Sequence, residues 1–194
     1  METYEVRIVF TEPLLGTVAL EEELFSEFVK NKGIDNDDEL ETLPVAEQIE
    51  KGTTGFHRVD GQPILYDYVL KGFFKDACGM LRRVRKTESS KCKAYKKIID
   101  GLVFVTPRRI PIELSGELTF LERPLRAQTA QGERIALARS EQAPAGSSIA
   151  FTMTALGQVD EKLLTEWLDY GSLRGLGQWR NAGWGRFQYA LTKR

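Results

Sequence analysis

Alternation of apolar and polar residues predicts several strands along the chain. Near the amino end every second residue from Tyr4 to Phe10 is a large apolar one, which predicts a strand over residues 3–11 with one buried face. The same pattern, or a short apolar run, predicts four more strands: 101–106, 110–114, 147–155 and 184–191. A short segment, 118–121, is predicted to pair with the strand over 110–114, and the polar stretch 123–139 has little to anchor it.

Two segments carry apolar residues at the period of an α-helix. The first predicts a helix over about 66–86, with these residues on one face: Leu70, Phe73, Phe74, Ala77, Leu81 and Val84. The second predicts a helix over 160–170, with Asp160 as N-cap and Gly171 as C-cap. Shorter helices are predicted over 20–30 and 45–51. With 194 residues, the chain suits one domain over residues 1–194, with an insertion at about 17–60.

Composition places the chain among soluble globular proteins, because 42% of its residues are hydrophobic and 28% are charged. No apolar run is long enough to cross a bilayer, and the acidic start does not resemble a secretory leader, so we expect a cytoplasmic protein without a membrane partner. Cys78 and Cys92 lack the number and spacing of a metal site, and we expect them to be reduced. We expect no metal and no cofactor.

Charge is strongly segregated although the net charge is only −1. Residues 20–50 contain eleven acidic residues and two lysines, a local balance of −9, whereas residues 71–97 have a balance of +8. The last segment, 171–194, has five basic residues and no acid. Local potential steers a polyanion more than total charge does, so the two basic segments would form an anion-binding face if they meet in space.

The first basic segment begins as a stripe on the predicted helix. Lys71, Lys75, Arg82 and Lys86 are spaced by four, seven and four residues, which holds them on one side of the helix. The alternative interpretation is a solvated helix face without a ligand. Further lysines predict a flexible basic extension: Lys91, Lys93, Lys96 and Lys97.

The second basic segment is rich in glycine. Residues 171–187 read GSLRGLGQWRNAGWGRF, with five glycines among arginines and tryptophans. Glycines let a backbone turn its N–H groups toward an anion, and arginine and tryptophan suit phosphates and unstacked bases. Dinucleotide and phosphate-loop fingerprints place a strand before the glycines and a helix after them, whereas here the order is reversed. The alternative is a tight helix-to-strand turn whose tryptophans fill the core.

Four motifs, in order along the chain, resemble the RAMP superfamily, the repeat-associated proteins of CRISPR effector systems. They are IVFTEPLLG, PILYDYVLKGFFKDA with Lys71-Gly72, QAPAGSSIAFTMTA and RGLGQWRNAGWGRF. The resemblance is nearest to the backbone subunits that coat the guide RNA in antiviral defence, or to a stand-alone or mobile-element relative of them. It implies an α+β fold, a ferredoxin-like or RNA-recognition-like sandwich with an antiparallel sheet and a glycine-rich loop before the last strand. Tyr66-Asp67-Tyr68, where the family often has small turn residues, and the acidic, partly helical insertion depart from the pattern.

The leading hypothesis is a binding module that grips the phosphate backbone of RNA, or of another single-stranded nucleic acid. Its partners would be RNA, other subunits of a ribonucleoprotein, or copies of itself. The basic helix, the polar segment and the glycine-rich segment supply the expected contacts: Lys71, Lys75, Arg82, Arg123, Arg126, Arg174, Gly175, Gly177, Trp179, Arg180, Gly183, Trp184, Gly185 and Arg186.

Two other functions stay open at this point. The chain could mimic a subunit in order to occupy a protein partner, for example as a CRISPR inhibitor, which the acidic insertion favours. It could also be a metal-independent endoribonuclease, with His57 as the catalytic residue. Four aspartates also fall between the first strand and the first long helix, but none of them lies in a diagnostic motif: Asp35, Asp37, Asp38 and Asp60.

Overall fold

The computed structural model describes residues 1–20, 53–129, 132–157 and 159–194. The predicted helices over 20–30 and 45–51, and with them most of the acidic insertion, lie outside the described residues. In the described part of the chain, no helix is both long enough and apolar enough to cross a membrane.

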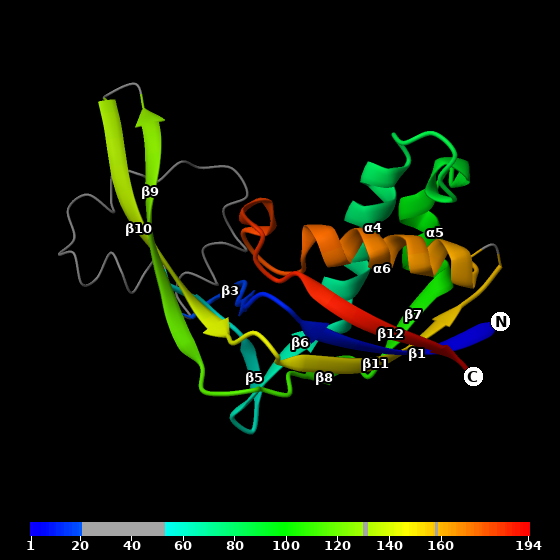
Figure 1. Ribbon diagram of the computed structural model, residues 1–194, viewed down its shortest axis with the longest axis horizontal. Coiled ribbons are helices and arrows are strands. Elements are labelled where there is room, and N and C mark those ends of the chain that lie inside the picture. Colours follow the sequence, from blue (N-terminus) through cyan, green and yellow to red (C-terminus); the bar gives the residue numbers. More distant parts are fainter. Residues whose placement is uncertain (21–52, 130–131, 158) are drawn as a thin grey trace.

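A four-stranded antiparallel sheet forms the centre of the molecule (Figure 1). Its strands, from one edge to the other, are β12 (Phe187–Lys193), β1 (Glu2–Phe10), β11 (Ser148–Ala155) and β7 (Val103–Thr106). Numbered along the chain, this order is 4-1-3-2. A helix follows the first strand and another follows the third, which gives the βαββαβ order of a ferredoxin-like sandwich.

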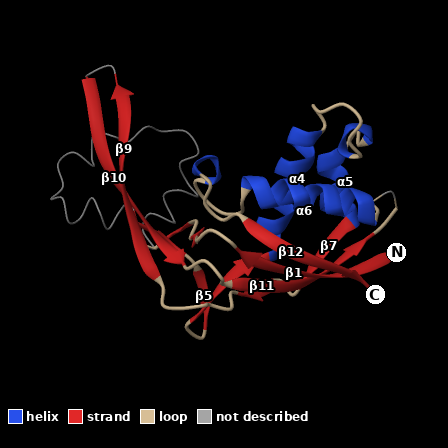
Figure 2. Ribbon diagram, in the orientation of Figure 1, coloured by secondary structure: helices blue, strands red, loops and turns tan. Residues whose placement is uncertain are grey.

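Among the described residues, three helices lie against one face of this sheet: α4 (Asp67–Leu81), α5 (Tyr95–Leu102) and α6 (Glu161–Arg174) (Figures 1 and 2). The alternating residues of β1 point toward the helices and are at most 2% exposed, as the sequence pattern predicted. Helix α4 contributes Leu70, Phe73, Phe74 and Ala77, and α6 contributes Leu163, Leu164, Trp167 and Leu168. The predicted α+β class with an antiparallel sheet is confirmed.

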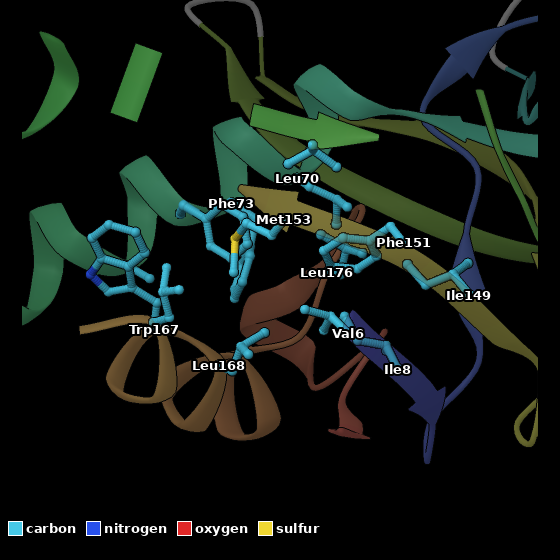
Figure 3. Packing of buried hydrophobic residues seen from close by; sticks show 14 of the residues in the cluster. Val6, Ile8, Leu70, Phe73, Ile149, Phe151, Met153, Trp167, Leu168 and Leu176 are labelled. Atoms are coloured by element: carbon cyan, nitrogen blue, oxygen red, sulfur yellow. The ribbon is translucent and has the colours of Figure 1, made fainter. Parts of the chain in front are cut away.

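Trp167 and Leu168 of α6 lie in the core with Phe73 of α4 (Figure 3), and α6 also packs closely at Gly171. A Cβ at this position would overlap the rings of Phe73 on α4 and Phe187 on β12, so only glycine allows the approach. Asp160 is the N-cap as predicted, since its carboxylate accepts a hydrogen bond from the backbone N–H of Leu163 at 3.0 Å. The predicted C-cap at Gly171 is wrong. The helix continues to Arg174 and ends at Gly175, whose φ of 88° leaves the helical region.

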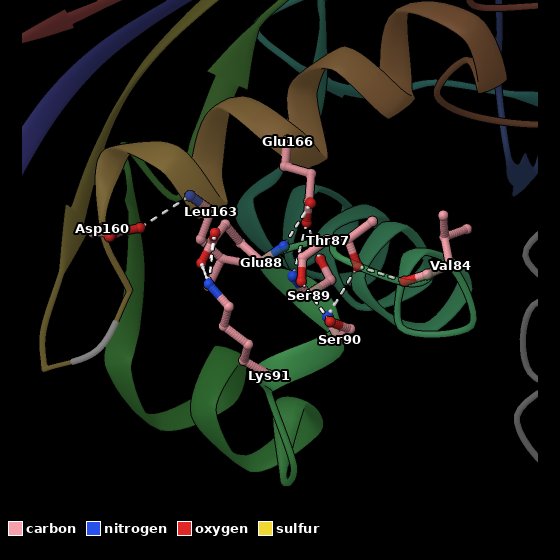
Figure 4. Close-up of polar contacts among 9 residues, drawn as sticks. All are labelled: Val84, Thr87, Glu88, Ser89, Ser90, Lys91, Asp160, Leu163 and Glu166. Carbon is pink, nitrogen blue, oxygen red and sulfur yellow. Dashed lines mark hydrogen bonds and ion pairs between the residues drawn. The ribbon is translucent and has the colours of Figure 1, made fainter.

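The segment after α4 is not the flexible basic extension that the lysines predicted. Residues Ser89–Lys91 form a 3₁₀ turn (η1), and α5 follows. The carboxylate of Glu166 on α6 holds this turn: it accepts the backbone N–H groups of Glu88 and Ser89, each at 2.8 Å, and the Ser89 hydroxyl at 2.5 Å (Figure 4). The Ser89 hydroxyl also accepts the buried indole N–H of Trp167 at 3.0 Å. These contacts attach the basic segment to the core.

A long hairpin projects from the sandwich (Figure 1). Its antiparallel strands are β9 (Thr119–Thr129) and β10 (Gly132–Ala143), so the predicted pairing of 118–121 with 110–114 is wrong. Strand β10 also pairs with three-residue β4 (Thr53–Gly55) and with β2 (Leu14–Leu15), and β3 (Val18–Ala19) pairs with β4. A third sheet contains β5 (His57–Val59), β6 (Gln62–Tyr66) and β8 (Arg109–Pro111).

Candidate nucleic-acid interface

The glycine-rich loop between α6 and β12 is fixed at both ends by its own backbone. Gly175 and Gly185 both have positive φ, and a Cβ on either would overlap the backbone strand that passes it. This close crossing lets the Leu176 N–H donate to the Gly185 carbonyl and the Gly185 N–H donate to the Pro13 carbonyl, both at 2.9 Å. The loop is therefore attached to the turn that follows β1.

Most of the glycine amides predicted to grip phosphate already have partners inside the protein. The N–H groups of Gly175, Gly183 and Gly185 donate to the carbonyls of Gly171, Arg180 and Pro13. Only the Gly177 N–H, among these four glycines, has no hydrogen bond to the residues that the structure describes. Any anion-binding groups of this loop would therefore have to be side chains and not a nest of backbone amides.

Two arginines of the loop region converge on one carboxylate of α4. The Arg180 guanidinium donates to Asp76 Oδ2 at 2.7 Å, and Arg174 Nε lies 3.8 Å from the same oxygen. Arg174 also donates to the side-chain carbonyl of Asn181 in the loop. All three members of this ion-pair cluster keep 28–29% of their side-chain area exposed. A guanidinium has five N–H donors, so donors remain for a ligand.

A third arginine reaches the loop from the hairpin. The Arg123 guanidinium carbon, on β9, lies 5.2 Å from the centre of the Trp179 ring, a cation–π distance. A hollow of about 540 Å³ opens between hairpin and loop, and six of its lining residues are Arg123, Arg174, Gly177, Trp179, Arg180 and Asn181. We call it the arginine hollow. None of the described residues that line it is acidic.

The loop holds Trp179 in a left-handed conformation, with φ of 50°. Such a conformation costs a non-glycine residue about 1–3 kcal/mol and persists where surrounding contacts fix it. Here the Ala182 N–H donates to the Trp179 carbonyl at 2.9 Å, and Arg123 lies over the ring. Trp184 is half-buried elsewhere in the loop, and exposed Arg186 places its guanidinium beside Gly183. Neither lines the arginine hollow.

The basic stripe of α4 does not join this cluster. Lys75 forms a 2.5 Å ion pair with Asp100 of α5, and Lys71 donates to the Asp100 carbonyl at 3.2 Å. Arg82 lies over the Tyr95 ring of α5, at 5.1 Å. One residue turns a helix by about 100°, which places Asp76 on a different side of α4 from Lys75. Helix α5, which was not predicted, packs against this basic side of α4.

Arg126 lies in β9, but its side chain is outside the described part of the structure. The sequence suggested that the Lys71 stripe and the glycine-rich loop form one anion-binding face. In the described residues they form two separate surfaces.

His57 lies in an aromatic cluster that sequence reasoning missed. Its ring meets Tyr66 edge-on at 4.8 Å, and Tyr66 stacks on Tyr68 at 5.3 Å with 14° between the ring planes. The Tyr68 hydroxyl is 3.5 Å from His57 Nε2, and burial lowers the pKa of His57. The signal available in the sequence was the pair of tyrosines at the junction of β6 and α4.

These rings line a second hollow of about 510 Å³, which we call the aromatic hollow. Six of its lining residues are Phe56, His57, Tyr66, Tyr68, Val69 and Gln178. Buried Glu141 on β10 fixes the backbone next to His57, since its carboxylate accepts the Phe56 N–H at 3.0 Å and pairs with Arg58. In the described residues, no group of three or more His, Cys, Asp or Glu side chains is placed to hold a metal ion.

No protein-family model matches the chain, and no curated protein matches it. Among solved structures, the chain is similar to a subunit in the cryo-EM structure of the type III-B Cmr-beta complex bound to cognate target RNA, with 12% identity and a TM-score of 0.54. That match covers 99% of this chain and 60% of the other, so the chain spans about three fifths of the length of its neighbour.

A subunit of a type IV-B CRISPR complex also matches, with 12% identity, a TM-score of 0.48, and coverage of 98% of this chain and 90% of the other. At such identities, the Cmr-beta likeness is evidence for the fold alone. It agrees with the ferredoxin-like order of strands and helices, the fold that the resemblance in the sequence implied, while the superfamily itself stays a prediction.

Proposed function

We propose that this protein binds single-stranded RNA through the arginine hollow, as a subunit of a CRISPR-type ribonucleoprotein. The observation that carries the proposal is the convergence of Arg123, Arg174 and Arg180 around a hollow whose described lining has no acid. Guanidinium groups bind phosphate oxygens in a fork geometry, and an adjacent indole suits an unstacked base. The likeness of the fold to a subunit of an RNA-bound complex supports the choice of RNA.

Asp76 gives the hollow a defined geometry before any ligand arrives. Its carboxylate holds Arg180 directly and lies near Arg174, which limits the rotamers of two long side chains. A side chain that is already ordered loses less entropy when it binds phosphate. The same carboxylate partly neutralises the positive charge of the two arginines. Asp76 therefore orders their side chains and at the same time weakens their attraction for phosphate.

The other basic residues take secondary places in the proposal. A separate basic surface lies against α5 and contains Lys71, Lys75 and Arg82. The carboxylate of Asp100 neutralises part of its positive charge. Exposed Arg186 and half-buried Trp184 lie in the same loop as the arginine hollow but outside its lining. We expect weaker effects on RNA affinity from these residues than from Arg174 and Arg180.

The test is the salt dependence of RNA binding by a double charge reversal, Arg174→Glu with Arg180→Glu. Each phosphate neutralised on a single strand contributes about 0.7 to the slope of log affinity against log salt, so the variant should flatten that slope by about 1.4 and bind more weakly. Fluorescence anisotropy with labelled single-stranded RNA measures both quantities.

The matched control is Arg83→Glu with Arg85→Glu, which makes the same change in charge at two exposed positions beyond the end of α4. It should retain most of the affinity and the slope of the unmodified protein. If both double variants weaken binding equally, net charge and not the arginine hollow accounts for it. If neither does, the hollow has no part in RNA binding.

A second candidate function, metal-independent RNA cleavage, is favoured by the contact between His57 and Tyr68. Burial lowers the pKa of His57 and raises that of Tyr68, so at neutral pH the imidazole is free to accept a proton while the phenol keeps one to donate. This candidate predicts RNA cleavage in the presence of a chelator that His57→Ala abolishes. Cleavage that persists in His57→Ala would exclude His57 as the base.

The third sequence hypothesis, a mimic that occupies a protein partner, depended on the acidic insertion. Most of that segment lies outside the described residues, and no described contact favours the hypothesis.

A further inference from the structure

Consecutive residues of the glycine-rich loop line the two hollows. Gly177 and Trp179 line the arginine hollow, while Gln178, between them, lines the aromatic hollow. Consecutive Cα atoms are about 3.8 Å apart, so the two hollows open on neighbouring residues of a single stretch of backbone. A ligand with an anionic part and a flat apolar part could occupy both.

The chemistry of the aromatic hollow differs from that of the arginine hollow. None of its described lining residues is a lysine, arginine, aspartate or glutamate, and most are apolar. Its rings are already arranged in a stack, with Tyr66 and Tyr68 nearly parallel and Tyr68 55% exposed. Polar side chains are few, and two of them, His57 and Gln178, carry groups that can hydrogen-bond to the edge of a base stacked on Tyr68.

We propose that the aromatic hollow receives one unstacked base of the RNA whose phosphates the arginine hollow holds. Stacking on Tyr68 supplies affinity with little base preference, because every base has a π face. The proposal rests on the proposed function, since a base is brought to this position by a backbone held at Arg174 and Arg180. It assigns to His57 and Tyr68 a role in binding that does not require cleavage.

The experiment compares two probes of roughly 12 nucleotides, a length within the site sizes of single-strand-binding domains. One is oligouridine RNA, and the other is the same ribose-phosphate chain without bases. Anisotropy measures the affinity of the full chain and of two variants, Tyr68→Ala and Tyr68→Phe, for each probe. Tyr68 is exposed, so neither substitution opens the core, and thermal unfolding verifies the fold of each variant.

The unmodified protein should bind oligouridine more tightly than the abasic chain. Tyr68→Ala should lose about tenfold for oligouridine, the effect of removing one base–aromatic stack, and little for the abasic chain. Tyr68→Phe keeps the ring and should stay close to the unmodified protein.

Equal binding of both probes by the unmodified protein, or an unchanged Tyr68→Ala, would overturn the base site while leaving the arginine hollow in place. A protein that binds neither probe would overturn both proposals together.

Discussion

Gly171 offers a sharp test of how the core positions the candidate site. A Cβ at Gly171 overlaps the rings of Phe73 and Phe187, which are 3% and 1% exposed and have no room to rotate away. Gly72, in the middle of α4, has no atom within 4 Å of its ideal Cβ position among the described residues. The same substitution, glycine to alanine, should therefore have opposite effects at the two positions.

The expected changes in unfolding free energy follow from two opposing effects, the helix propensity of alanine and the overpacking of the core. Alanine is favoured over glycine inside a helix by about 1 kcal/mol, which both variants gain. Overpacking a core costs about 1–3 kcal/mol, and two rigid rings place Gly171→Ala at the upper end of that range. We therefore expect Gly171→Ala to lose about 2 kcal/mol of unfolding free energy and Gly72→Ala to gain up to 1 kcal/mol. In a chain of this size, these changes correspond to melting temperatures lower by about 4–8 °C and higher by about 2–4 °C.

Urea unfolding followed by tryptophan fluorescence measures both changes, because buried Trp167 lies in the same core. RNA affinity provides a second measurement. Arg174 ends α6, so a displaced helix should weaken binding in Gly171→Ala and leave it unchanged in Gly72→Ala. If Gly171→Ala were as stable as Gly72→Ala, the close packing of α6 against Phe73 and Phe187 would be refuted.

Three further predictions concern single side chains. Asp76→Asn should tighten RNA binding and steepen its salt dependence in anisotropy titrations, because it removes a negative charge beside two arginines of the proposed phosphate site. Glu166→Ala should lose about 2 kcal/mol in urea unfolding, because the buried Ser89 hydroxyl and two backbone N–H groups lose their acceptor. Burial lowers the pKa of His57 from 6.5, so the folded state binds this proton less readily than the unfolded state, and stability should fall as pH drops below about 6.5. In His57→Gln, the loss of stability in urea between pH ~7.5 and ~5.5 should be smaller.

The parts of the fold that sequence predicts correctly are those in which one face of an element is buried. The residues of β1 alternate because one side of the strand faces the helices, and α4 shows the helical period because Leu70, Phe73, Phe74 and Ala77 all pack into the core. In such elements the apolar pattern reports tertiary burial directly.

The missed elements are those whose stability comes from contacts far away in the sequence. In α5, four residues do keep the spacing of one helix face: Tyr95, Ile98, Ile99 and Leu102. The helix is only eight residues long, however, and follows a run of lysines, which favours a basic extension in the sequence. Its placement depends on the turn at Ser89 and on Glu166, 77 residues further along the chain. The β9–β10 hairpin is stabilised by backbone pairing between strands in which polar residues make up about half of the sequence and do not alternate regularly with apolar ones, so the period of a half-buried strand was absent there.

The candidate site, too, was predicted in part and missed in part. Composition of the loop identified Trp179, Arg174 and Arg180, and the polar segment supplied Arg123. The counter-charge at Asp76 was not predicted, because it appears in the sequence as one acid within a basic helix. The prediction that Lys71 and the loop form one surface is wrong, because α5 places Asp100 and Tyr95 against that side of α4.

The arginine hollow lies between the sandwich and the projecting β9–β10 hairpin, so its geometry depends on how the hairpin is attached to the sandwich. Arg174 ends α6 and Arg180 lies in the loop after it. The far end of this loop is set by the pairing of β12 with β1: Phe10 is opposite Phe187, and the Thr11 N–H donates to the Arg186 carbonyl at 2.8 Å. The third, Arg123, belongs to the hairpin, which reaches the body through short pairings of β10 with β2 and β4. An RNA backbone that contacts all three arginines must bridge hairpin and sandwich. RNA should therefore slow hydrogen exchange where β10 pairs with β4, at Arg139 and Ser140, as well as in the loop, and protection confined to the loop would remove Arg123 from the site.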